Sequence, residues 1–415
     1  MRILLIHQAF LEKGDGGGSR FNEMTQVWAS QGHEITVLGG MVHYTTGKKT
    51  PRYKGKFTFK DEGFYENVDV IRCHISESYN VNFLGRLWAY FSFVFSSIYA
   101  GLFKTKGKFD VILVTSPPLF VGITAYVLSL IKRTPFVFEV RDLWPESAID
   151  AGVLKNGMII KFAYWFEKFI YKRAKLINVL TPAFRDKLIN DKKVPAEKVI
   201  FIPNAADFTL AEKIQENFDA KAFKQELGLA DKFVITYVGA HGVANHLIQL
   251  LDAAEHLRDT NVVFQLIGSG MRKDALIKET KSRNLENQVI FRDPVSKQEV
   301  FKYILSSDMG ASVLKRVDTF KTIYSNKTFD YMSCKKPILL AIEGVSKDLV
   351  ETANCGICVI PEDANSIANG IKTYKQQEAL HKEHGQNGYE YAKIHFDRQK
   401  LAVDYIEHIK KSVEK

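Results

Sequence analysis

Cysteine is scarce in this chain, with four residues in 415. Cys355 and Cys358 form a C-x-x-C, but they lie in "ANCGICVIP", a pattern typical of a turn that leads into a strand. The other two cysteines add no paired metal-ligand spacing. We therefore interpret the cysteines as core thiols, expect no metal site, and take a reducing cytoplasm as the expected compartment.

Long apolar runs are also lacking. The most apolar stretch, Leu87–Phe103, contains three serines and falls short of the ~20 residues that a membrane-spanning helix needs. At helical spacing, one face of this stretch carries the large residues Leu87, Phe91, Val94, Ile98 and Leu102, and another carries the small residues Gly85, Ala89, Ser92 and Ser96. We predict a buried helix, with a membrane contact that does not span the bilayer as the alternative.

Negative charge is in deficit, since 57 lysines and arginines face 47 acidic residues and leave a net charge of +10. This balance favours an anionic partner. We expect no nucleic acid, because no basic-aromatic single-strand motif or recognition helix stands out. Residues 158–175 predict a basic amphipathic helix with Lys161, Lys168, Lys172 and Lys175 on one side. These lysines are the candidate contacts to an anionic membrane surface; a solvated surface helix is the alternative.

Short apolar runs alternate with helical segments through most of the chain. "RILLIH", "EITVLGG", "DVILVTS" and "PFVFEV" are typical of parallel strands covered on both faces. The chain becomes polar and lysine-rich at residues 207–231, and the pattern then restarts with "FVITYVGA" and "VVFQLIGSG". We predict two doubly wound α/β domains, 1–205 and 206–388, with a ligand cleft between them and a helical segment, 389–415, that packs back on the first domain.

A glycine-rich turn follows the first predicted strand and precedes the first helix. It contains Gly14, Gly16, Gly17 and Gly18. Glycine lets the backbone approach a phosphate closely, and the free N–H groups at a helix start point at the anion. The turn is neither a G-x-G-x-x-G nor a G-K-[ST] loop, so dinucleotide and P-loop interpretations are weak. It is either an anion site or a plain connector.

The second half repeats this arrangement. Gly239 and Gly268 each follow a predicted strand, and "YSNKTFDYM" places Ser325 at a helix N-cap position with Lys327 in the first turn. Asp330 comes one turn later on the same side. A lysine near a helix N-terminus is unfavourable unless it meets an anion. We predict that Lys327 binds a phosphate and that Asp330 accepts hydrogen bonds from a ribose; a solvated lysine and a first-turn carboxylate are the alternative.

In this order, the glycine-rich turn, "FVFEVRDLWPES", "VIFIPNAAD", "ITYVGA", "FQLIGSG" and "SNKTFDYMSCKKPIL" resemble the family 4 retaining glycosyltransferases. The likeness extends over almost the whole chain, and "RDLWPES" and "SNKTFDYM" are most similar to transferases that build bacterial surface polysaccharides, such as fucosamine transferases. It implies a GT-B fold, in which two Rossmann-like domains face a central cleft. It also implies transfer of an N-acetylated or deoxy aminosugar from a UDP-sugar to a lipid-linked or saccharide acceptor, without cofactor or metal.

The resemblance also assigns roles to residues. It implies donor binding by Gly17, Gly18, Gly239, Gly268, Lys327 and Asp330. The family's Arg and Lys after the "YVG" strand fall near His241 and Asn245, so we take His241 as a further donor-binding candidate and Lys315 as a candidate to replace the missing positive charge. The resemblance places Arg141 and Asp142 where many members have a catalytic His-Asp, and Glu146 lies just beyond them. With Asp142, Glu146 is the candidate to orient the acceptor hydroxyl. The implied setting is the cytoplasmic face of the cell membrane.

Two departures from the family pattern keep other functions open. The first acid of the family's E-x7-E motif falls on Thr322, and the catalytic His position holds Arg141. A UDP-sugar 2-epimerase of similar fold is one alternative, and a non-catalytic nucleotide-sugar binder is another.

Overall fold

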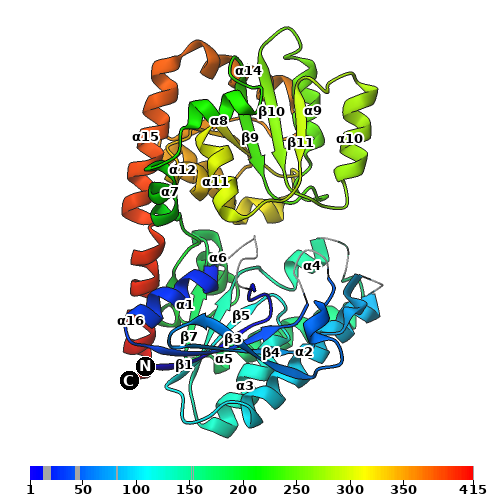
Figure 1. The fold of residues 1–415 in the computed structure, drawn as a ribbon. Helices are drawn as coiled ribbons and strands as arrows, with labels where there is room; N and C mark the ends of the chain where they lie inside the picture. Colours follow the sequence, from blue (N-terminus) through cyan, green and yellow to red (C-terminus); the bar gives the residue numbers. More distant parts are fainter. Residues whose placement is uncertain (13–19, 43–46, 81–82, 151, 153, 415) are drawn as a thin grey trace. The chain divides into compact units, whose positions relative to one another are not determined.

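The chain forms two compact units in a computed structural model that describes residues 1–12, 20–42, 47–80, 83–150, 152 and 154–414. The first unit comprises residues 1–203 together with 399–415, and the second comprises 204–398 (Figure 1). The sequence prediction placed the first boundary at residue 205 and separated 389–415 as a helical segment.

The first unit is built on an eight-stranded sheet with the order β3-β4-β2-β1-β5-β6-β7-β8. All neighbouring strands are parallel except β3, which runs antiparallel to β4. Most of these strands are buried along their length, as their continuous apolar sequences predict. The strands are β1 (Arg2–His7), β2 (Glu34–Gly40), β3 (Thr58–Tyr65), β4 (Val68–Cys73), β5 (Val111–Ser116), β6 (Phe136–Val140), β7 (Leu176–Val179) and β8 (Val199–Phe201).

Helices cover both faces of this sheet (Figure 1). They are α1 (Arg20–Ser30), α2 (Phe83–Phe103), α3 (Val121–Lys132), α4 (Glu146–Asp150), α5 (Gly157–Arg173), α6 (Pro182–Asp186) and the C-terminal α16 (Arg398–Val413). The Trp28 indole of α1 donates a hydrogen bond of 2.7 Å to the carbonyl of Ala402 in α16, and its ring meets Tyr405 edge-on. The last helix is therefore part of the first unit's core.

The helix α2 differs from its prediction as a buried helix. The small residues Ala89, Ser92 and Ser96 are buried, whereas Trp88 and Phe95 are each 56% exposed. The interpretation of a fully buried helix is thus wrong for one side of α2. Within the part of the chain that the structure describes, no helix has the length and apolar character needed to span a membrane.

The second unit has a six-stranded parallel sheet with the order β11-β10-β9-β12-β13-β14. The strands are β9 (Phe233–Val238), β10 (Val262–Ile267), β11 (Val289–Arg292), β12 (Met309–Val313), β13 (Ile338–Ala341) and β14 (Gly356–Cys358). The helices are α7 (Phe208–Gln215), α8 (Ala220–Glu226), α9 (Ile248–Glu255), α10 (Lys273–Ser282), α11 (Lys297–Leu305), α12 (Asn326–Ser333), α13 (Val345–Thr352), α14 (Ala364–Gln376) and α15 (Glu378–His395).

The strand order of the second unit reverses at β9. The chain proceeds from β9 through β10 to β11 on one side, and β12 then pairs on the other side of β9. In open α/β sheets, ligands bind beyond the carboxyl ends of the strands at such a switch point. We therefore expect a binding site among the residues that follow β9, β10 and β12.

Candidate functional site

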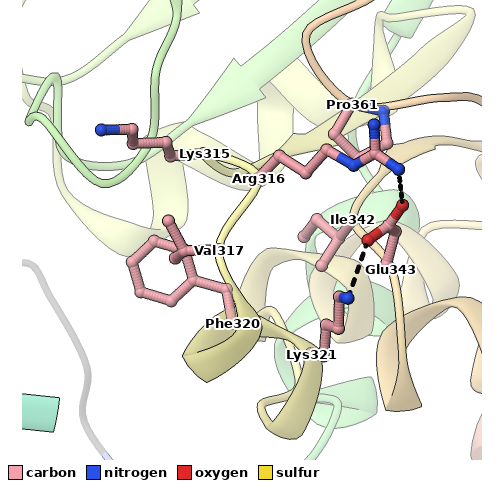
Figure 2. Close-up of a pocket in the computed structure, with 8 residues that line it drawn as sticks. All are labelled: Lys315, Arg316, Val317, Phe320, Lys321, Ile342, Glu343 and Pro361. Carbon is pink, nitrogen blue, oxygen red and sulfur yellow. Dashed lines mark ion pairs between the residues drawn. The ribbon is translucent and has the colours of Figure 1, made fainter. Parts of the chain in front are cut away.

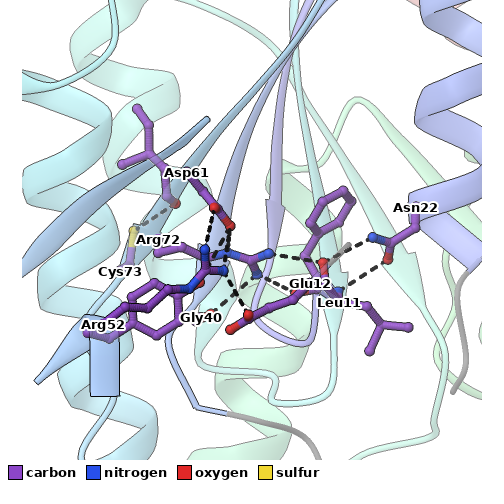
Figure 3. Close-up of polar contacts among 11 residues, drawn as sticks. Leu11, Glu12, Asn22, Gly40, Arg52, Asp61, Arg72 and Cys73 are labelled. Atoms are coloured by element: carbon purple, nitrogen blue, oxygen red, sulfur yellow. Dashed lines mark hydrogen bonds and ion pairs between the residues drawn. The ribbon is translucent and has the colours of Figure 1, made fainter. Parts of the chain in front are cut away.

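The glycine-rich turn of the first unit carries Gly17 and Gly18, which lie outside the described residues. The segment just before it is held by a buried arginine. Arg72 donates to Asp61 (Nε to Oδ2, 2.9 Å) and to the carbonyl of Leu11 (2.9 Å), and it also donates to the carbonyl of Phe10 (Figure 3). A buried charge of this kind is stable only when fully paired, and here the pairing fixes the backbone leading into the turn.

The segment after the turn is anchored from α1. Asn22 exchanges two hydrogen bonds with the backbone of Leu11, so the two flanks of the turn are tied to each other (Figure 3). Arg20, the first residue of α1, is buried and donates to both oxygens of Glu139 at 3.1 and 3.2 Å. Two buried arginines thus hold the segments on either side of the glycine-rich turn. Sequence reasoning identified neither Arg72 nor Arg20.

The predicted catalytic residues follow β6, at the carboxyl edge of the first sheet. Asp142 is half-buried and accepts a 2.7 Å hydrogen bond from Ser147. Burial raises the pKa of Asp142, and the bond from Ser147 opposes this rise. Arg141 is also half-buried, and its charge helps to lower the pKa of His7, whose main cause is burial.

Glu146 is the first residue of α4 and is engaged in an ion pair. Its Oε1 lies 2.8 Å from Nζ of Lys192, which also contacts Glu167 at 2.6 Å. Burial raises the pKa of Glu167 to about 7, against the opposing charge of Lys192. A lysine shared between two carboxylates holds Glu146 in place, and no sequence pattern predicts Lys192 as the partner of Glu146.

The glycine turns of the second unit lie at the switch point, and their backbones require glycine. Gly239 and Gly268 have φ angles of +143° and +146°. A Cβ on Gly268 would stand 1.9 Å from the carbonyl oxygen of Gly239, and one on Gly239 would stand 3.4 Å from Cε of Lys327. The two turns therefore lie side by side, and the Gly239 turn is open to the Lys327 side chain.

His241 is fully buried beside these turns. Its ring lies 5.9 Å from the Phe291 ring, and neither ring nitrogen has a hydrogen-bond partner among the described residues. Burial and the charge of Lys273 lower the pKa of His241 to about 4, so the imidazole is neutral at physiological pH. Lys273, which sequence reasoning missed, donates to the carbonyls of Gly268 (3.0 Å) and Arg292 (2.9 Å) and thereby fixes the second turn.

Lys327 is the second residue of α12 and its ammonium group points into the switch-point region. It lies 3.3 Å from Oγ of Ser325 and 4.8 Å from the ring centre of Tyr237. Ser325 occupies the N-cap position but makes no side-chain cap bond, because its hydroxyl accepts from Ser312 at 2.6 Å. Burial lowers the pKa of Lys327 to about 8. A partly desolvated cation at an uncapped helix N-terminus is well suited to bind an anion.

Asp330 follows one turn later on α12. Burial raises its pKa to about 6, while Lys297 opposes this rise and Asp207 adds to it. Lys297 is itself paired with Asp207 at 2.6 Å. In the described part of the chain Asp330 and Lys327 form no ion pair with each other, so each keeps capacity for an external ligand.

Lys315 lines a shallow pocket beyond β12 and β13 (Figure 2). Arg316 and Lys321 converge on Glu343 there, at 2.9 and 3.4 Å, whereas the exposed Lys315 side chain points away from that carboxylate. Thr322, at the position of the missing acid, donates within its own turn to the carbonyl of Thr319 at 2.7 Å.

The predicted membrane-contact lysines and the cysteines lie apart from the glycine turns in the sequence. Lys161, Lys168, Lys172 and Lys175 are all exposed, the first three on α5 and the fourth just after it. All four cysteines are free thiols, and Cys73, Cys334 and Cys355 are buried. Within the described ranges, no group of three or more His, Cys, Asp or Glu side chains is arranged to hold a metal ion.

The fold has close likenesses among solved structures. The UDP complex of Anabaena HepE matches 99% of this chain and 100% of HepE, with a TM-score of 0.71 and 18% identity. WaaG, a glycosyltransferase involved in lipopolysaccharide biosynthesis, matches 96% of this chain and 98% of WaaG, with a TM-score of 0.68 and 12% identity. The chain has the GT-B fold, with two Rossmann-like units.

Two family models then match consecutive parts of the chain. Residues 15–205 match the glycosyl transferase 4-like domain, and residues 219–391 match the glycosyl transferases group 1. WcaI of Escherichia coli K12, which is named as a glycosyl transferase of colanic acid biosynthesis, is 24% identical over 417 residues, covering 99% of this chain and 100% of WcaI. The protein therefore belongs to the family 4 glycosyltransferases.

A second relative adds chemical detail about its own reaction. It is an N-acetylgalactosaminyltransferase of Campylobacter jejuni that acts on a saccharide joined to diphospho-undecaprenol, and it is 23% identical over 61% of this chain and 64% of its own length. The two family models confirm the predicted family. The comparisons give no support to the epimerase alternative.

Proposed function

We propose that this glycosyltransferase moves a sugar from a UDP-sugar to a lipid-linked saccharide, with retention at the anomeric carbon and without a metal. The observation that carries the proposal is the half-buried ammonium of Lys327 beside the Gly239 turn, at the N-terminus of α12. The leaving group of such a reaction is a diphosphate, whose growing negative charge must be stabilised. Lys327 and the backbone amides of the glycine turns supply that stabilisation.

Each predicted residue then has a role. Asp330 accepts hydrogen bonds from the ribose, and Gly268 and the neutral His241 shape the nucleotide side of the site. Lys315 adds positive charge near the diphosphate. In the first unit, Gly17 and Gly18 approach the diphosphate, and Arg141 adds a positive charge near the reacting centre. Asp142 orients the acceptor hydroxyl, and Glu146 supports it in the position that Lys192 fixes.

The names of two relatives support the choice of sugar and acceptor. The C. jejuni enzyme transfers an N-acetylated sugar onto a diphospho-undecaprenol saccharide, and WcaI is named for colanic acid biosynthesis. We infer an N-acetylated or deoxy aminosugar, a polyprenyl diphosphate acceptor and a role in bacterial surface polysaccharide synthesis. The protein would act at the cytoplasmic face of the cell membrane, where Lys161, Lys168, Lys172 and Lys175 meet anionic lipids.

A panel of UDP-sugars tests the reaction. Each donor is incubated with the full chain, with and without a polyprenyl diphosphate saccharide, and UDP release is measured in the presence of a chelator. Release that depends on donor and acceptor, with the anomeric configuration kept in the product by NMR, supports the proposal. If the chain binds a UDP-sugar but releases no UDP, it is a non-catalytic nucleotide-sugar binder. If it converts one UDP-sugar into another without releasing UDP, it is an epimerase.

A further inference from the structure

The outward faces of three neighbouring helices of the first unit are apolar where a soluble protein would be polar. On α2 the exposed side chains Leu84, Trp88, Phe95 and Phe103 recur at helical spacing along its full length. A helix of 21 residues is about 30 Å long. The exposed apolar side chains therefore form an extended stripe, which single exposed residues scattered over a surface would not.

The helix α5 presents a second stripe of the same kind. Met158 is 80% exposed, Trp165 is 59% exposed, and Phe162 between them is half exposed. The Phe162 and Trp165 ring centres lie 5.6 Å apart in a tilted arrangement. An ordinary surface helix would bury such large apolar side chains. In α5 the buried face instead carries Ala163, Phe166 and Ile170.

Ring contacts beneath the surface link α2 to α5 across the start of α3. Phe91 of α2 lies 5.1 Å from Phe120, which lies 6.0 Å from Phe166 of α5, which in turn lies 6.3 Å from Phe162. The three helices lie together on one side of the first unit's sheet (Figure 1). The α3 helix contributes the exposed side chains Leu130 and Ile131. We call the exposed apolar side chains of α2, α3 and α5 together the aromatic face.

The charges around the aromatic face show which partner it fits. The sequences of α2, α3 and α5 contain a single acidic residue, Glu167, and that carboxylate is buried and paired with Lys192. The lysine stripe of α5 runs directly beside its aromatic stripe, since positions 161, 168 and 172 lie within about a quarter turn of 158, 162 and 165. Protein surfaces interleave both signs of charge, whereas an apolar surface whose own helices carry exposed lysines and no exposed carboxylate complements an anionic bilayer.

We propose that the aromatic face inserts into the interfacial layer of a bilayer that contains anionic phospholipid, as a monotopic anchor. Tryptophan and tyrosine rings favour this layer because they are apolar with one polar edge. The lysines alone would give docking that salt releases, whereas inserted aromatic side chains hold the protein after the charges are screened. The inference deepens the proposed function, on which it depends only for the membrane setting.

Vesicle flotation of the full chain tests the anchor. The vesicles are phosphatidylcholine alone, or phosphatidylcholine with about one third phosphatidylglycerol, at low salt and at 1 M NaCl. The wild type is expected to stay bound to the anionic vesicles at 1 M NaCl. Trp88→Ala/Phe95→Ala and Phe162→Ala/Trp165→Ala are each expected to lower the partition coefficient about tenfold or more at both salt concentrations. Complete release of the wild type by salt, or unchanged partitioning of both variants, would overturn the proposal.

Matched variants separate the anchor from other effects. Ile394→Ala removes an equally exposed side chain, 59%, from α15 of the second unit and is expected to change nothing. Replacing Lys161, Lys168, Lys172 and Lys175 with Gln is expected to weaken binding at low salt only. The aromatic variants should keep the wild-type Tm, because the removed side chains are exposed. If the wild type instead forms a dimer in sedimentation that these variants abolish, the face binds a second copy and the membrane proposal is wrong.

Depth and catalysis provide two further readouts. In a Trp144→Phe background, brominated phosphatidylcholine is expected to quench Trp88 and Trp165, but not the fully buried Trp28 that remains after Trp88→Phe/Trp165→Phe. Equal quenching in both proteins would contradict insertion. UDP release from a soluble donor, measured without vesicles, is expected to be unchanged in the alanine variants. A chain that binds vesicles but releases no UDP would refute the proposed reaction and leave the anchor standing.

Discussion

Lys327 makes the affinity for UDP depend on pH in a predictable direction. Its pKa is lowered to about 8 by burial, so the free protein carries a mixture of charged and neutral lysine at mildly alkaline pH. The diphosphate binds the charged form, and binding should therefore draw a proton from solution. Below pH 7 the lysine is already charged, and above pH 8 it must be protonated at increasing cost.

The size of the effect follows from the pKa. With a pKa of about 8, the charged fraction falls from roughly nine tenths at pH 7 to roughly a quarter at pH 8.5, which weakens UDP binding about fourfold. At pH 8, binding should take up about half a proton. This window avoids the pKa of about 6 at Asp330 and of about 4 at His241.

Calorimetry in buffers of different ionisation enthalpy measures both quantities. Lys327→Arg keeps the positive charge and is expected to bind UDP with no proton uptake and no change in affinity between pH 7 and 8.5. Lys327→Met should lose about 1.5–3 kcal/mol of binding at pH 7 and also show a flat profile. If the wild type takes up no proton at pH 8 and its affinity stays constant, Lys327 does not bind the diphosphate.

Three further predictions concern the second unit. Asp330→Asn should stabilise the ligand-free protein at pH 7.5 by up to about 3 kcal/mol in urea unfolding, because the folded pKa of about 6 lies above the unfolded value and ionisation of Asp330 costs stability above pH 6. The same change should weaken UDP binding. A variant that binds UDP normally would contradict the ribose role. His241 has a folded pKa of about 4, below its unfolded value, so stability should fall by about 2 kcal/mol from pH 7 to pH 5, and His241→Asn should flatten that part of the urea-unfolding profile; an equally steep decline in the variant would assign the loss to other groups. Gly268→Ala should lower both Tm and UDP affinity, since its Cβ would meet the Gly239 carbonyl at 1.9 Å, whereas normal melting and binding would show that this turn yields easily.

The architecture could be predicted from the sequence because its signals are local. Continuous apolar runs such as those of β5 and β6 are typical of buried parallel strands, and their alternation with helices predicts doubly wound units. Lys327 and Asp330 fall on one side of α12 through the helical period alone. Strand runs and helical faces are both encoded in short windows of sequence.

Long-range pairs could not be predicted in this way. Arg72 lies about 60 residues from the backbone it holds at Leu11, and Lys192 lies 46 positions after Glu146, so no spacing rule connects them. The exposed side of α2 was missed for a different reason. Large apolar residues occur nearly all round that helix, and a pattern without a polar face cannot show which side the sheet will bury.

The position of α16 has a consequence for how the chain is made. Residues 204–398 form the second unit without interruption, whereas the first unit needs residues 399–415 as well as 1–203. During synthesis, the N-terminal unit therefore waits for the last residues of the chain, while the unit encoded after it is already complete. Until α16 arrives, Trp28 lacks the Ala402 carbonyl that accepts from its indole and the Tyr405 ring beside it. A stop codon or a protease cut near residue 398 would consequently harm the beginning of this protein rather than its end, and quality control would act on an incomplete first unit joined to a finished second one.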